Sequence, residues 1–156
     1  MYQFKHPHEL LLGDIIQIEE LIASGGQVSP KGLRARIEKA SRIGVAKVKD
    51  EVVAVAAIKC VNNDYKERVF EACDKEEFKD GFEYEIGWVV TKEQFKRNGI
   101  AKGIINSLIQ MSNENSYFAT SKNDIGRHLM ASCGFTEIGS YVNNNENEIS
   151  LMIYTL

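Results

Sequence analysis

The stretch FKRNGIAKG, residues 95–103, decides the fold, and it follows the apolar run YEIGWVVT at 84–91. The run at 84–91 is rich in β-branched and aromatic residues, which predicts a strand. Beyond the loop, apolar residues recur at helical spacing, at Ile100, Ile104, Leu108 and Met111. This period predicts a helix that begins at or just after Gly99.

The start of that helix has the character of a phosphate-binding turn. The first turn of a helix presents unpaired backbone N–H groups and the positive end of the dipole, and small residues let a pyrophosphate approach them. Lys96, Arg97 and Lys102 add positive charge there. The alternative is an ordinary helix start with solvated charges. Two other phosphate motifs are excluded, because no G-x-x-x-x-G-K-[ST] run exists and Ile104 stands where a dinucleotide fingerprint needs a small residue.

The rest of the chain predicts alternating strands and helices in a mixed α/β fold, an α+β arrangement with a mixed sheet. The residues from 62 to 82 carry many acids and could hold a strand or a helix around Tyr65 to Cys73. Ser29-Pro30 has the pattern of an N-cap followed by proline at the first helical position. The other expected elements are a strand at 1–5, a helix at 11–22, a hairpin at 43–48 and 52–58, a strand at 117–120, a helix at 124–132, and a hairpin at 135–142 and 149–154.

Length and composition limit the class of protein. With 156 residues, 44% of them hydrophobic, the chain is expected to form a single domain over residues 1–156. A net charge of -3 argues against a nucleic-acid partner, although the basic positions of residues 31 to 39 leave a local patch open. Three cysteines without C-x-x-C spacing predict neither a disulfide framework nor a metal site. No signal peptide or long apolar run is visible, so we expect a soluble cytoplasmic protein with no membrane partner.

Two motifs carry a resemblance to a known family. The loop Lys96-Arg97-Asn98-Gly99-Ile100-Ala101 fits the pattern [QR]-x-x-G-x-[GA] except at Lys96. Residues 123–135, NDIGRHLMASCGF, fit N-x-x-A-x-x-L-Y-x-x-x-G-F except at Gly126 and Met130. In element order and in these motifs the chain resembles the GNAT superfamily of acyl-CoA-dependent N-acyltransferases, and the motif-level similarity covers about residues 83 to 135.

The resemblance implies an acyl-CoA donor, here acetyl-CoA as co-substrate. It implies that the pantetheine lies along the strand ending at Thr91, and that Val89 or Val90 donates a backbone N–H to the thioester carbonyl. Asn123 matches the family asparagine that commonly contacts the cofactor arm. The backbone amides expected on the pyrophosphate are those of Lys96, Arg97, Asn98, Gly99, Ile100 and Ala101.

An amine acceptor must lose a proton before it attacks a thioester, because an alkylammonium has a pKa of about 10.4. By the two-residue period of a strand, Glu83, Glu85, Gly87 and Val89 share one face, which makes Glu85 the first candidate for the base and Glu83 the second. The alternative is that both glutamates are ordinary solvent-face residues. In the family a tyrosine often protonates the leaving thiolate, and Met130 occupies that place here.

The resulting hypothesis is an enzyme, an N-acetyltransferase that moves an acetyl group from acetyl-CoA to an amine by direct attack. The alternative is a non-catalytic acyl-CoA-binding regulatory domain, which Met130 favours. The acidic residues of 62–82 are compatible with a cationic acceptor, although a solvated acidic surface is the commoner explanation. The acceptor, the acyl-chain length and the oligomeric state are not defined by the sequence, which is compatible with a homodimer.

Overall fold

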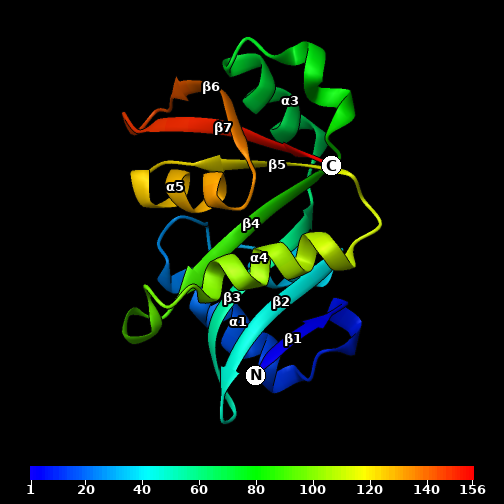
Figure 1. Cartoon of the computed structure of the whole chain (residues 1–156), viewed down its shortest axis with the longest axis vertical. Helices are drawn as coiled ribbons and strands as arrows, with labels where there is room; N and C mark the ends of the chain where they lie inside the picture. Colours follow the sequence, from blue (N-terminus) through cyan, green and yellow to red (C-terminus); the bar gives the residue numbers. More distant parts are fainter. The chain divides into compact units, whose positions relative to one another are not determined.

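The computed structural model describes all residues from 1 to 156, and the chain divides into two compact units. Unit 1 comprises Met1–Lys59 and Ile86–Ser112, and unit 2 comprises Cys60–Glu85 and Asn113–Leu156. Seven strands pair in the order β1-β2-β3-β4-β5-β7-β6, with parallel pairing between β4 and β5 and antiparallel pairing at the ends of the order. This mixed sheet with its helices confirms the predicted mixed α/β class. Figure 1 shows the course of the chain within each unit.

Unit 1 contains the N-terminal strands and the helix that follows the phosphate-binding turn. β3 has only its last residue in unit 2, and β4 belongs to unit 1 from Ile86 onward. Short 3₁₀ turns occur at Pro7–Glu9 and Glu93–Phe95. The elements are β1 (Tyr2–Lys5), α1 (Leu12–Ser24), α2 (Leu33–Glu38), β2 (Arg42–Val48), β3 (Glu51–Cys60), β4 (Tyr84–Thr91) and α4 (Ile100–Met111).

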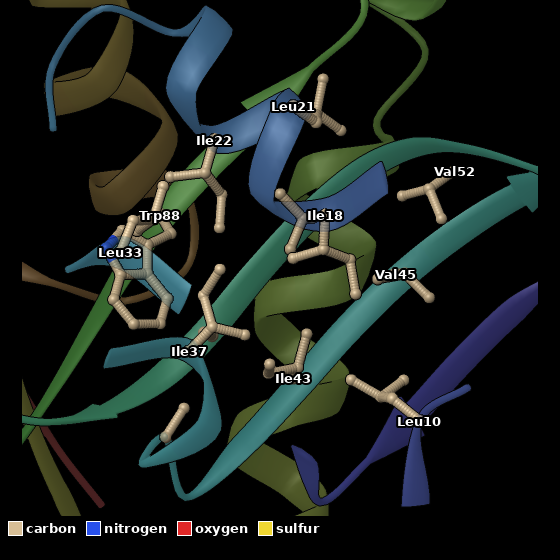
Figure 2. Close-up of a cluster of buried hydrophobic side chains, with 13 residues drawn as sticks. Leu10, Ile18, Leu21, Ile22, Leu33, Ile37, Ile43, Val45, Val52 and Trp88 are labelled. Atoms are coloured by element: carbon tan, nitrogen blue, oxygen red, sulfur yellow. The ribbon is translucent and has the colours of Figure 1, made fainter. Parts of the chain in front are cut away.

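The strands of unit 1 are covered on both faces. On one face α1 and α2 pack their apolar side chains onto β2 and β3, and Figure 2 shows Ile18, Ile37 and Trp88 within this cluster. On the other face lies α4, in front of β2 in Figure 1. Gly44 of β2 permits close contact with α4, because a Cβ at Gly44 would lie 2.6 Å from the γ2 methyl of Ile104. This packing holds α4 in place on the sheet, and with it the loop that precedes the helix.

Unit 2 contains the C-terminal strands and two helices. Parallel pairing of β4 with β5 places Glu85 opposite Phe118. A 3₁₀ turn runs through Glu76–Gly81. The elements are α3 (Asn63–Ala72), β5 (Ser116–Ser121), α5 (Asp124–Ser132), β6 (Thr136–Val142) and β7 (Glu148–Thr155).

Side-chain alternation along β5 separates the two faces of the sheet in unit 2. Phe118 packs edge-on against Phe70 of α3, with ring centroids 5.4 Å apart. The neighbouring Tyr117 points to the opposite face, where its ring contacts Tyr154, which in turn contacts Phe135 just after α5. Helix α3 and the end of α5 therefore cover opposite faces of this part of the sheet.

Most expected elements occur where the patterns predicted them, including the two hairpins and the helix at 124–132. The ambiguous segment around Tyr65 is the helix α3. The prediction that the second helix starts at Ser29-Pro30 was wrong, because α2 begins at Leu33. Its N-cap is Gly32, which has a φ of 70°. None of the helices is both long and apolar enough to cross a membrane.

Candidate functional site

The loop before α4 has the backbone shape of an anion-binding turn. Arg97 and Gly99 both adopt the left-handed conformation, with φ of 62° and 73°. Gly99 is the N-cap of α4, and a Cβ built there meets no atom within 4 Å, so the space next to the loop is open. Left-handed residues beside a helix start turn successive N–H groups toward one concave surface, which favours an anion. Helix α4 begins at Ile100, directly after Gly99, as the sequence predicted, and phosphate binding by the loop 96–101 stays a prediction.

Side-chain contacts hold this loop in shape. The Asn98 amide donates to the carbonyl oxygens of Phe95 and Lys96, at 3.2 Å each. The Lys96 ammonium pairs with the Glu93 carboxylate at 2.7 Å, and this hydrogen bond lowers the pKa of Glu93. Because Glu93 offsets the charge of Lys96, the exposed Arg97 and Lys102 leave the rim of the loop net positive.

Strand β4 is distorted at Trp88. The residue has a φ of 52°, which is unusual for a bulky side chain. Its indole is only 7% exposed and packs in the cluster with Leu33 and Ile37, beside which it lies in Figure 2. Trp88 is therefore a core residue. The positive φ interrupts the regular alternation of the strand, so Val89 and Val90 follow a local kink.

Glu85 is buried in unit 2 under helix α3. Only 3% of the residue is exposed, so Glu85 is not an ordinary solvent-face glutamate. The Tyr65 hydroxyl donates a hydrogen bond to Glu85 Oε1 at 3.3 Å and lies 3.5 Å from Thr120 Oγ1. Burial, followed by the nearby Glu85 charge, raises the pKa of Tyr65, so this phenol is neutral at physiological pH.

Glu83, the second candidate base, lies one residue before β4 and is exposed. The two glutamates therefore occupy different environments: Glu85 lies against α3, and Glu83 lies at the surface. Only Glu85 combines burial with a hydrogen-bond donor whose position is fixed by a helix.

Asn123 is the N-cap of α5, and its side-chain oxygen accepts a hydrogen bond from the Gly126 backbone at 2.7 Å. Gly126, a departure from the family pattern, fits here because a Cβ at this position would clash with Ser121 Oγ. Ser121 Oγ in turn donates to the Asn123 carbonyl at 3.1 Å. Met130, the other departure, is buried with 4% exposure.

Tyr65 and Thr120 are the residues that sequence reasoning missed. Tyr65 lies in the acidic segment whose secondary structure was ambiguous, and twenty residues separate it from Glu85. Thr120 lies on β5, on the same face as Phe118. No motif or spacing in the sequence connects these residues, because their proximity depends on how α3 packs on the sheet.

Comparison with known proteins adds an independent line of evidence. A family model described as "Acetyltransferase (GNAT) family" matches residues 15–135. No curated protein sequence matches the chain significantly.

Several solved structures share the fold. A ribosomal-protein-alanine N-acetyltransferase from Brucella melitensis has a TM-score of 0.71 at 14% identity, over 99% of both chains. The yncA protein of Salmonella typhimurium, a putative acetyltransferase solved with acetyl-CoA, has a TM-score of 0.70 at 15% identity, over 100% of this chain and 93% of its own. An aminoglycoside 6'-acetyltransferase type Ii has a TM-score of 0.68 at 14% identity, over 99% of this chain and 96% of its own.

Proposed function

The chain belongs to the GNAT acetyltransferase family, which uses acetyl-CoA as donor, and on this basis we propose that it acetylates an amine acceptor by direct attack on the thioester. The observation that carries the proposal is the left-handed loop at 96–101 in unit 1, and the buried carboxylate of Glu85 in unit 2 is a separate observation that supports it. The loop supplies donor binding, and the carboxylate supplies the base.

Donor binding is assigned to the loop before α4. The backbone N–H groups of residues 96–101 bind the pyrophosphate, with Arg97 and Lys102 providing long-range attraction. The open space next to Gly99 supports this assignment, because phosphate oxygens must approach the backbone closely. Asn123 is proposed to contact the cofactor arm through its amide nitrogen while its oxygen caps α5.

The kink of β4 supports a role for Val89 or Val90 in binding the thioester carbonyl. A left-handed residue within a strand turns the adjacent peptide groups out of the regular hydrogen-bond ladder. The positive φ of Trp88 precedes Val89 directly, and burial of the indole holds the kink in place. One backbone N–H after the kink then stabilises the oxyanion that forms on the carbonyl oxygen during attack.

Glu85 is proposed as the general base. Its carboxylate accepts the proton that the amine loses, the C–N bond forms as the amine attacks the carbonyl carbon, and the C–S bond breaks as the CoA thiolate leaves. Tyr65 donates a hydrogen bond to one carboxylate oxygen and thereby helps to hold the Glu85 side chain in position. Glu83, which is exposed, is the second candidate.

The leaving thiolate does not require a tyrosine at position 130. A thiol has a pKa of about 8.5, so a thiolate is a tolerable leaving group near neutral pH and takes its proton from water. Met130 lies buried in α5 and serves packing instead.

A cationic acceptor suits the acidic segment at 62–82. This segment forms α3 and the 3₁₀ turn, and its acids at Asp74, Glu76 and Glu77 are exposed. The names of two structural neighbours, an aminoglycoside acetyltransferase and a ribosomal-protein-alanine acetyltransferase, indicate amines as acceptors of those proteins. Neutralising the three acids is expected to raise the KM for the acceptor without changing the Kd for acetyl-CoA. A cytoplasmic location and a homodimer remain predictions of the sequence.

Two measurements on the purified chain test the proposal. Calorimetric titration with acetyl-CoA and with coenzyme A measures donor binding, and thiol release across a panel of polyamines, aminoglycosides and peptides with free amines measures transfer. The proposal expects binding of both ligands and release with at least one amine. Binding without release for every amine supports the non-catalytic alternative, and absence of binding overturns both.

A further inference from the structure

A second candidate binding site is present in unit 2, at the first turn of α3. A pocket of about 260 Å³ is formed where the end of β3 and the beginning of β4 meet this helix. Sites for drug-sized ligands are usually larger, roughly 300 Å³ or more, so a pocket of this size suits a small molecule. It is lined by Cys60, Val61, Asn63, Lys66, Glu83 and Tyr84.

Lys66 is the unusual residue of this pocket. Lysine is rarely buried unless its charge is paired, yet Lys66 is only 8% exposed. It stands three and four positions before Val69 and Phe70, which form the apolar face of α3, so its methylene stem packs on that face. The ammonium has no hydrogen-bond or ion-pair partner in the chain and keeps contact with solvent, and the residue lines the pocket.

The surroundings of Lys66 favour a negatively charged group. Asn63 opens α3, and the unpaired N–H groups of the first turn add the positive end of the helix dipole. The Asn62 side chain caps only one of these groups, by accepting from the Asp64 backbone at 2.7 Å. A carboxylate bound near Lys66 would therefore meet both an unpaired ammonium and a positive helix end.

Glu83 places a negative charge on the wall of the same pocket. Lys66 and Glu83 both line the space, but they form no ion pair with each other. Separated opposite charges in one small pocket are satisfied together by a ligand that carries both charges. A simple anion would be repelled by Glu83, and a simple cation by Lys66.

We propose that this pocket binds a small zwitterion of the amino-acid type, with its carboxylate on the Lys66 ammonium and its ammonium on the Glu83 carboxylate. The apolar wall at Val61 then lies next to the part of the ligand that carries no charge. The inference is independent of acetyl transfer, since it concerns binding alone and applies whether the zwitterion is an acceptor or an effector.

The test compares L-alanine with propionate and ethylamine, which retain its carboxylate or its ammonium but not both. Each probe is titrated against the full chain in the absence of acetyl-CoA, and the backbone amide resonances of Asn63 and Lys66 are followed by NMR. The proposal expects alanine to shift these resonances and to bind at least about tenfold more tightly than either singly charged probe. Equal affinity for alanine and propionate, or shifts confined to other residues, would overturn it.

Variants locate the two charges. Lys66→Met keeps the length of the stem and removes the ammonium, and Glu83→Gln removes the opposite charge; each is expected to weaken alanine binding about tenfold or more. Lys122→Met, which removes a lysine charge outside the pocket lining, is the matched control and is expected to bind alanine normally. Because Glu83 is exposed, Glu83→Gln tests the proposal even if Lys66→Met does not fold, and unchanged affinity in it contradicts the assignment.

Discussion

The Tyr65 hydroxyl donates a hydrogen bond to Oε1 of Glu85 at 3.3 Å, joining helix α3 to the start of strand β4. The contact is partly buried, and only 3% of Glu85 is exposed, so its polar atoms need hydrogen-bond partners within the protein. It links α3, whose secondary structure the sequence left open, to the residue proposed as the base.

Replacing Glu85 with glutamine tests the assignment of the base. Glu85→Gln keeps the shape and an oxygen that accepts from Tyr65, but it removes the proton acceptor. We expect kcat to fall about a hundredfold or more, while the Kd for acetyl-CoA stays within a factor of two or so. Steady-state thiol release and calorimetry measure the two quantities.

The matched control for that variant is Glu137→Gln, which changes an exposed glutamate on β6 and is expected to retain activity. Glu83→Gln distinguishes the second candidate. If Glu83→Gln loses far more activity than Glu85→Gln, the exposed glutamate is the base and the assignment to Glu85 is wrong.

Tyr65→Phe removes only the phenolic hydroxyl. Loss of the bond to Glu85 is expected to lower the free energy of unfolding at pH 8 by about 1 kcal/mol. The loss of orientation at Glu85 is expected to reduce kcat several-fold with little change in KM. Chemical denaturation and initial rates measure these effects, and an unchanged kcat would show that Tyr65 has only a structural role.

The raised pKa of Tyr65 has a consequence for stability at high pH. In the unfolded chain the phenol ionises near its ordinary pKa of 10.0, whereas in the folded chain it stays protonated to higher pH. The stability that Tyr65 contributes through this shift is therefore fully present below pH 10. It declines as the pH rises above 10, by about 1 kcal/mol over the first pH unit. Tyr65→Phe lacks this contribution, so its unfolding free energy should fall less steeply between pH 8 and 11 than that of the unmodified chain. If the unfolding free energies of the variant and the unmodified chain fell equally steeply with pH, the environment assigned to Tyr65 would be wrong.

The left-handed conformation of Gly99 gives a test of the donor loop. Gly99→Ala is expected to cost about 1 kcal/mol of stability, because a Cβ disfavours a φ of 73°. It is also expected to weaken acetyl-CoA binding about tenfold, since the methyl group narrows the approach to the backbone. Gly26→Ala is the control: its φ of 67° carries the same strain and its Cβ also meets open space, but it lies outside the loop. Equal donor affinity in both variants would show that the loop does not bind the pyrophosphate.

Close packing between β2 and α4 is tested at Gly44. Gly44→Ala places a methyl group 2.6 Å from Ile104 and 3.0 Å from the ring of Phe4, and we expect it to destabilise the fold by about 1–3 kcal/mol. Gly13→Ala, in α1 with nothing within 4 Å of its Cβ, is expected to leave stability unchanged or raise it by up to about 1 kcal/mol. Thermal unfolding compares the two, and equal stability of both variants would indicate that α4 shifts easily on the sheet.

Structural features that depend on residues close together in the chain could be predicted from the sequence. The helical spacing after Gly99 placed the start of α4, and the apolar runs on either side of Lys49 placed the hairpin of β2 and β3. The loop at 96–101 could be named as a candidate phosphate-binding turn because its small residues and its helix start lie within a few positions. The start of α2 was misplaced, because the cap at Gly32 competes with the proline pattern before it.

The sequence by itself thus determined the mixed α/β class and the order of most elements, and it supplied the candidate for the donor loop, because these depend on periodicity and on short-range motifs. Only the tertiary structure decided that Tyr65 donates to Glu85, that Trp88 adopts a positive φ, and that Lys66 is buried beside a pocket. The first and third features depend on which side chains meet when α3 packs on the sheet, and the second is stabilised by the enclosure of the indole among α1 and α2. Such contacts join residues far apart in the chain, and local patterns do not encode them.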